Sequence, residues 1–123
     1  MIEATFEIDD WNEDPVDESS PKLTETIATK RFSGDIDGTS TIAYTMAYGE
    51  NGTAVVVGLE RLEATIGDRS GTLVLRHVGN FADGAATADI TVMDEHGTGD
   101  FAGVTGSGSM RADPAGSMSL ELD

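Results

Sequence analysis

Glu60 and His77 are ionisable residues that lie within the two most apolar segments of the sequence. These segments, Val55–Ile66 and Arg69–Val78, are rich in Val, Leu, Ile and Thr and flank a Gly-Asp turn, which predicts a β-hairpin. If both residues face the interior, they place a carboxylate beside an imidazole in apolar surroundings. Burial of that kind raises the pKa of a carboxyl group and prepares it for proton transfer. The alternative, which we favour, is a pair of satisfied polar groups that fix strand register.

Other sites of chemistry lack the residues that they need. The chain has no cysteine, so it forms no disulfide or thiolate metal site. The glycine-rich segment 97–106 has neither the Lys-Ser/Thr pair nor the following helix of a phosphate-binding loop. Segment 35–38, Asp-Ile-Asp-Gly, lacks the further ligands of a calcium loop. His77 and His96 have no recognisable ligand partners, so the sequence predicts neither a metal nor a cofactor.

The charge balance restricts the partners. Twenty-three acidic residues stand against seven basic ones, a net charge of −16, so nucleic acids and anionic membrane surfaces are repelled. No apolar run approaches the ~20 residues that span a bilayer, and no secretory signal is recognisable, so we expect a cytoplasmic protein. Such an acidic surface suits a high-salt milieu, where screening relieves self-repulsion. The alternative is an ordinary acidic protein whose stability does not depend on salt.

Period-two alternation of apolar and polar residues predicts about eight strands. They are Ile2–Ile8, Leu23–Ser33, Ile36–Tyr48, Val55–Ile66, Arg69–Val78, Ala85–Met93, Ser107–Arg111 and Ser117–Leu122. With no segment of helical period, the prediction is all-β: one domain over residues 1–123, an antiparallel up-and-down barrel of lipocalin-like shape. A two-sheet sandwich is the alternative. Residues 9–22, acidic and interrupted by two prolines, are predicted to form a loop or flap that carries Trp11.

The predicted interior of the barrel is the candidate ligand site, because about eight strands enclose room for packed side chains or one small ligand. We expect a small apolar ligand to contact Trp11, Tyr44, Met46, Tyr48, Glu60, Leu75 and His77. The opposite face of strand Ile36–Tyr48 consists mostly of Thr and Ala and is uncharged apart from Asp37. A flat, uncharged face on so acidic a protein predicts association into a homodimer or homotrimer.

Four motifs together resemble a known family. They are segment 30–38 (Lys-Arg-Phe-Ser-Gly-Asp-Ile-Asp-Gly), segment 57–61 (Val-Gly-Leu-Glu-Arg), the strand from Arg69-Ser70-Gly71 to His77, and the bend from Gly97-Thr98-Gly99 to Gly106. The resemblance is to the DUF3224 family of uncharacterised bacterial proteins, over nearly the whole chain. That family is similar in turn to plant allene oxide cyclases and, more remotely, to dirigent proteins. The Ser-Gly-Asp of residues 33–35 and the Gly-Thr-Gly-x-Phe bend resemble segments of those plant proteins.

The resemblance implies an eight-stranded barrel with an apolar lumen, often assembled as a trimer. It also makes Glu7, in Phe-Glu-Ile, the counterpart of a lumenal cyclase glutamate. The asparagine two positions later in the cyclases is Asp9 here, and their pocket cysteine has no counterpart. Alternation conflicts with a lumenal Glu7, because it turns Phe6 and Ile8 inward instead. We favour the apolar residues inside.

The sequence leaves three functions open. The first is binding of a small apolar molecule in the lumen without chemistry, and we rank it first because no nucleophile–base pair or metal site is visible. The second, suggested by resemblance alone, is a cyclase or isomerase of a lipid-like substrate, in which Glu60 or Glu7, with His77 nearby, moves a proton. The third is a filled barrel that serves as an oligomeric scaffold.

Overall fold

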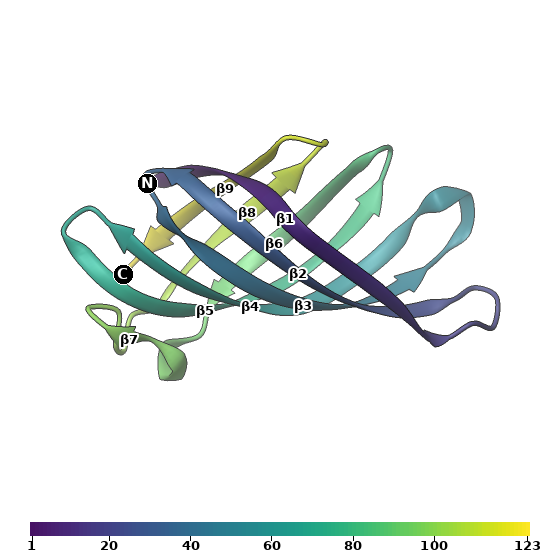
Figure 1. Cartoon of the computed structure of the whole chain (residues 1–123), viewed down its shortest axis with the longest axis horizontal. Coiled ribbons are helices and arrows are strands. Elements are labelled where there is room, and N and C mark those ends of the chain that lie inside the picture. Colours follow the sequence, from purple (N-terminus) through teal and green to yellow (C-terminus); the bar gives the residue numbers. More distant parts are fainter.

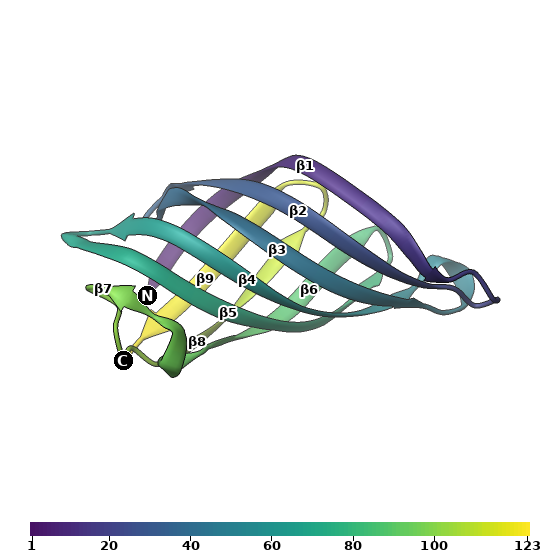
Figure 2. The ribbon, with the colours of Figure 1, turned by 60° about the horizontal axis from the view of Figure 1, so that its bottom comes forward.

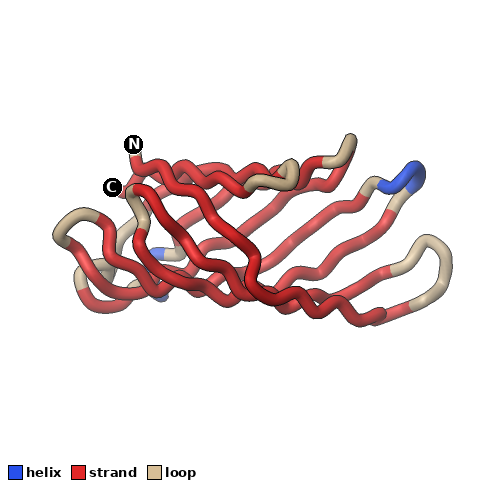
Figure 3. The backbone as a smooth tube through the Cα atoms, turned by 45° about the horizontal axis from the view of Figure 1, so that its top comes forward, coloured by secondary structure: helices blue, strands red, loops and turns tan.

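The computed structural model describes all 123 residues and consists almost entirely of strands (Figure 3). Two short 3-10 turns, η1 (Glu50–Gly52) and η2 (Asp94–His96), are its helical elements, and no helix has the length and apolar character needed to cross a membrane. The strands are β1 (Ile2–Asp17), β2 (Leu23–Gly34), β3 (Asp37–Tyr48), β4 (Ala54–Ile66), β5 (Arg69–Ala82), β6 (Ala85–Val92), β7 (Thr98–Gly99), β8 (Gly106–Ala112) and β9 (Gly116–Leu122).

Eight of the strands close into an antiparallel barrel (Figures 1 and 2). Each strand from β1 to β5 pairs with the strand that follows it in the sequence. The ring is then completed by the pairs β6–β8, β8–β9 and β9–β1. The two-residue β7 pairs with β5 beyond the point where β6 ends. Because the ring is complete, every barrel strand has two neighbours, which confirms the barrel and excludes the sandwich.

Strict alternation of burial along the strands sets what faces the lumen. In β3, Ser40, Ile42, Tyr44 and Met46 are buried while the Thr and Ala residues between them are exposed. In β4 every second residue from Gly58 to Ile66 is buried, which turns Glu60 inward. This is the pattern expected of a barrel with a packed interior and a solvated exterior.

Residues 9–17 form a strand, so the predicted loop over residues 9–22 is wrong for its first nine residues. They continue β1 and pair with β2 as far as Asp17 opposite Leu23, leaving only residues 18–22 as a turn. Strand β9 contacts β1 only from Ile2 to Phe6, so the second half of β1 is an edge. Charged residues and proline are what an edge strand tolerates, which explains how so polar a segment pairs.

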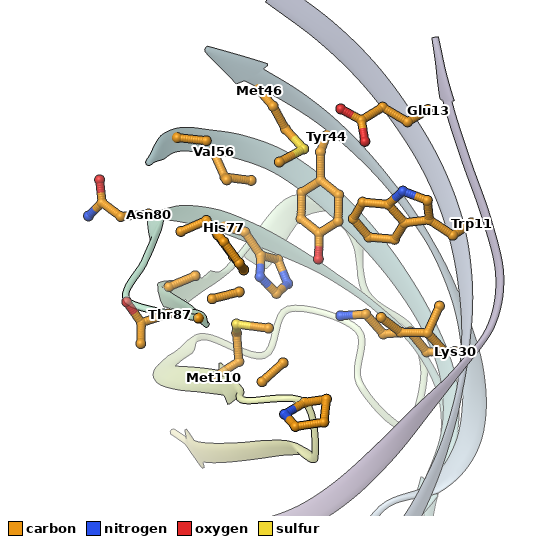
Figure 4. Close-up of a pocket in the computed structure, with 18 of the residues that line it drawn as sticks. Trp11, Glu13, Lys30, Tyr44, Met46, Val56, His77, Asn80, Thr87 and Met110 are labelled. Carbon is orange, nitrogen blue, oxygen red and sulfur yellow. The ribbon is translucent and has the colours of Figure 1, made fainter. Parts of the chain in front are cut away.

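A register shift between Ile8 and Asp10 changes which residues of β1 face inward. Before it, Ala4 and Phe6 are buried, which agrees with the alternation; after it, Trp11 and Glu13 turn toward the lumen (Figure 4). A β-bulge has this effect because one extra residue reverses the phase of a strand. Ile8, expected inside, lies opposite the inward Lys30 and lines the open half of the lumen, where it is 45% exposed.

The glycine-rich bend that follows β6 closes one end of the barrel. It crosses beneath the strand ends near both termini (Figure 1), where Phe101 and Val104 are buried in the main core. Gly99 has φ 62°, and a Cβ there would lie 2.7 Å from the carbonyl oxygen of Ser70, so the tight docking of the bend requires glycine. The motif predicted not to bind phosphate thus serves as a plug.

Candidate functional site

The opposite end of the barrel contains an open cavity of about 520 Å³. Thirteen of its 21 lining residues are hydrophobic, contributed by strands from all around the ring. Figure 4 shows Tyr44 and Met46 pointing into it from β3, and His77 from β5 on the other side of β4, beside Trp11 from β1. The wall that faces them is lined by small residues: Gly84, Ala86, Ala88 and Ala112.

A buried polar cluster forms the boundary between the cavity and the packed core. Glu60 accepts hydrogen bonds from Ser40 (Oγ to Oε2, 2.6 Å) and His77 (Nε2 to Oε1, 2.8 Å). The Lys30 amine forms an ion pair with the same carboxylate, Nζ to Oε2, at 3.4 Å. None of the four residues is more than 5% exposed.

Register brings these four residues together from four adjacent strands. Lys30 of β2 lies opposite Ser40 of β3. His77 of β5 lies opposite Gly58 of β4, and Glu60 is two residues further along β4. All four are at inward positions of their strands, so their side chains meet across the curved wall. Glu60 and His77 are therefore neighbours in the interior, as their spacing suggested.

The electrostatics of the cluster differ from the expected ones. Burial alone would raise the pKa of Glu60, but the hydrogen bond from His77, the charge on Lys30 and the Ser40 hydroxyl together lower it. Burial lowers the pKa of Lys30, and the Glu60 carboxylate offsets only part of that effect. The expectation of a raised carboxyl pKa is therefore wrong: Glu60 is held ionised as an acceptor.

Two buried polar atoms of the cluster have no hydrogen-bond partner: the Lys30 Nζ and the His77 Nδ1. The amine lies 4.4 Å from the ring centroid of Phe6, a cation–π contact that leaves its other N–H directions free. Both residues line the cavity, whereas Glu60 lies behind them and does not. The groups that a molecule in the cavity would meet at its floor are therefore those of Lys30 and His77.

Aromatic rings extend from the floor to the mouth. The Tyr44 ring meets His77 edge-on, with centroids 6.2 Å apart, and Trp11 packs on Tyr44 at 6.1 Å. Burial and the nearby Glu60 charge raise the pKa of Tyr44, so its hydroxyl stays protonated. At the mouth, Glu13 accepts hydrogen bonds from Tyr48 and from Thr24, the latter at 2.8 Å.

The predicted site residues separate into four groups, of which the first is Glu60 alone, behind the floor of the cavity and not among its lining residues. Trp11, Tyr44, Met46, Tyr48 and His77 line the cavity. Leu75 faces inward but packs in the filled half of the barrel and is not among the residues that line the cavity. Glu7 lies on the outer face, 79% exposed, in an ion pair with Arg31. The lumenal position that the family resemblance implied for Glu7 is therefore wrong, because the strand keeps Ala4 and Phe6 inside.

Sequence reasoning missed Lys30, Ser40 and Glu13. Lys30 shares its strand face with the buried Ala28 and Phe32, so the phase of β2 was a usable signal. Glu13 could not be found in this way, because the bulge that turns it inward leaves no mark on the alternation. No group of three or more His, Cys, Asp or Glu side chains that could hold a metal ion occurs in the structure.

The family model for DUF3224, described as a protein of unknown function, matches residues 2–123. The chain belongs to the DUF3224 family. A crystal structure of a DUF3224 protein of unknown function from Shewanella oneidensis MR-1 is similar, with 19% identity, a TM-score of 0.73, and coverage of 99% of this chain and 95% of that one. At that identity the likeness shows the fold alone. A comparison with curated proteins finds no match.

Proposed function

We propose that this DUF3224 protein binds one small, mostly apolar molecule in the open half of its barrel. The observation that carries the proposal is the cavity itself: about 520 Å³, largely apolar, and open at one end. Pockets for small molecules are typically roughly 300–1,000 Å³, apolar, with a few convergent polar groups. Space left in a protein interior reduces stability, so an unfilled lumen supports a ligand over a filled scaffold.

The position of Glu60 favours binding over the cyclase or isomerase alternative. A general base must reach the proton that it removes, within hydrogen-bonding distance or through one water. Glu60 is fully buried behind Lys30 and His77, and three partners occupy its two oxygens. Glu7 is on the outside of the barrel. Neither carboxylate suggested for proton transfer faces the cavity, so we rank the enzyme second.

Naphthalene is a suitable apolar probe for titration of the protein. Trp11 is the only tryptophan and lines the cavity, so its single indole N–H signal in an NMR spectrum reports on occupancy. We expect saturable shifts of that signal and binding heat by calorimetry. Ala86→Phe, which fills the cavity, should weaken binding by at least about tenfold, in keeping with the loss of a well-packed apolar contact. Ala102→Phe, the same substitution at an exposed position of the closing bend, should leave it unchanged.

The proposal fails if two results coincide. The first is that neither naphthalene nor its methoxy, hydroxyl and carboxylate derivatives bind, and the second is that native mass spectrometry of the purified protein finds no bound small molecule. It fails equally if Ala102→Phe and Ala86→Phe weaken binding by the same factor, because the probe would then not occupy the cavity.

We also propose that the protein self-associates through the outer face of strands β2–β5. Large apolar side chains gather there, each about half exposed: Ile27, Val55, Val57, Leu59 and Val78. Between them, β3 presents Ala43, Thr45 and Ala47. Glu25, opposite Thr45, and Arg76, opposite Leu59, are the charged residues among these positions. A mostly apolar face on a protein of net charge −16 is where two copies meet with least repulsion. The cavity lies on the inner side of the same strands, so association leaves it open.

Light scattering tests the association. The natural protein should give a dimer or trimer mass, and Val57→Asp should give the monomer mass with an unchanged circular dichroism spectrum. Ser117→Asp, at an exposed position of β9, which pairs with β1 and β8 and not with the strands of this face, is the matched control. A monomer mass for the natural protein at both low and high salt would contradict the proposal.

A further inference from the structure

Lys30 and His77 give the cavity floor a specific hydrogen-bonding requirement. Both side chains are at least 99% buried, both line the cavity, and each has one polar atom without a hydrogen-bond partner. These atoms are His77 Nδ1 and Lys30 Nζ, of which the latter has only its 3.4 Å ion pair with Glu60. Figure 4 shows the Lys30 amine pointing from β2 toward the His77 ring. A buried polar atom without a hydrogen bond costs free energy. Two such atoms at the end of an apolar cavity therefore point to a bound group that forms hydrogen bonds with both.

The identity of the missing partner follows from what each atom can do. His77 Nε2 is 2.8 Å from the Glu60 carboxylate, an acceptor, so Nε2 carries the proton in the neutral ring. Nδ1 is then a bare acceptor that needs a donor. The Lys30 amine has only donors to offer and needs an acceptor. The floor therefore offers one donor and one acceptor.

We propose that the ligand carries a hydroxyl group, as an alcohol or a phenol, that accepts a hydrogen bond from Lys30 and donates one to His77. This inference rests on the proposed binding function and defines its ligand class. A hydroxyl is the smallest organic group that is both donor and acceptor, and it satisfies both atoms without a change in charge. The rest of the molecule is apolar, to match the walls.

A carboxylate fits the floor less well. It accepts only, so it would satisfy Lys30 but offer no donor to His77 Nδ1. It would also be a second buried anion near Glu60, in a chain whose net charge of −16 already repels anions. An ether or ketone accepts but leaves His77 Nδ1 unpaired. A water molecule could bridge the two atoms, and it is the alternative that the experiment must exclude.

Four probes of one shape separate these cases by calorimetry on the natural protein: naphthalene, 2-methoxynaphthalene, 2-naphthol and 2-naphthoate. We expect 2-naphthol to bind at least about tenfold more tightly than the other three probes. The reason is that only its hydroxyl group forms both buried hydrogen bonds, one with Lys30 and one with His77. Its binding enthalpy should not depend on the ionisation heat of the buffer, because no proton is taken up.

Two variants assign the effect to the floor. Lys30→Met removes the amine at similar length. His77→Gln keeps a donor toward Glu60, where Nε2 lies, and removes the acceptor at Nδ1. Each should abolish the preference for 2-naphthol over 2-methoxynaphthalene, measured as the ratio of the two affinities for the same variant.

The inference is overturned if 2-naphthol and naphthalene bind the natural protein equally, the result expected when water occupies the floor. It is overturned equally if 2-naphthoate binds most tightly with uptake of a proton. In both cases naphthalene binding leaves the proposed function intact. Failure of all four probes, together with the absence of a bound small molecule in native mass spectrometry, contradicts the proposed function itself.

Discussion

One half of the barrel interior is filled and the other is hollow, although the same eight strands enclose both. In the closed half, large side chains fill the interior and are at most 1% exposed: Ile36, Leu62, Leu73 and Phe101. In the open half, the inward positions of β4, β6 and β8 carry alanine: Ala54, Ala86, Ala88 and Ala112. The number of strands is the same, so side-chain size decides where space remains. The cavity results from alanines at inward positions.

The cluster of Lys30, Ser40, Glu60 and His77 stands where the two halves meet. Below it the core contains apolar side chains, and above it lies the cavity. Buried charges persist in proteins when each is compensated by its neighbours. The contrast between the halves therefore predicts that identical changes have unequal effects in the two places.

The largest expected effect is removal of the plug. Phe101→Ala should lower the free energy of unfolding by about 3–5 kcal/mol, because Phe101 is fully buried in close-packed core. Phe81→Ala, the same change at a residue that lines the cavity and is 37% exposed, should cost only about 1 kcal/mol. Urea unfolding monitored by circular dichroism measures both. Equal losses would show that the two halves are packed alike.

The next effect tests the boundary. Glu60→Gln leaves Lys30 buried without a counter-charge and should cost about 3 kcal/mol at neutral pH. Glu63→Gln, an exposed position on the outer face of the same strand, should change stability by less than about 0.5 kcal/mol. A loss below about 1 kcal/mol for Glu60→Gln would mean that the cluster is not an ionic boundary.

The pH dependence of stability follows from the same residue. The folded pKa of Glu60 is lowered, so the unfolded chain binds more protons in acid. The stability that Glu60 contributes is fully present above its unfolded pKa and is lost as the pH falls through the folded value. Unfolding free energies between pH 7 and acid should therefore fall more steeply for the natural protein than for Glu60→Gln. Parallel curves would contradict the ionised state.

The smallest expected effect concerns salt at the rim of the open half. The extension of β1 and β2 carries a concentration of acidic residues, among them Asp9, Asp10, Asp14, Asp17 and Glu25. Molar chloride screens their repulsion, so amide hydrogen exchange there should slow a few-fold, while exchange in the closed half stays unchanged. Uniform slowing along the chain would assign the salt effect to net charge alone. No change would favour the ordinary acidic protein.

Sequence patterning was sufficient for the barrel and for part of the site. Alternation along β3 and β5 predicts an inward Tyr44 and His77, because a one-residue slip would expose the whole apolar face, whereas it left the face of Glu60 open. It fails along β1, where the bulge reverses the phase and pairing with β2 overrides the polar composition of residues 9–17. The hollow itself was not predictable, because it depends on which inward residues face one another across the lumen.

Closure of the ring by β1 and β9 has a consequence for how the protein folds. Ile2 pairs with Leu120, residues at opposite ends of the sequence, whereas every other barrel contact joins strands that are near each other along the chain. Loop-closure entropy delays contacts between distant segments, so we expect this seam to form late. Until it does, the sheet has two free edges, and both can pair with another chain. Aggregation during refolding should therefore depend on how quickly the first and last strands meet.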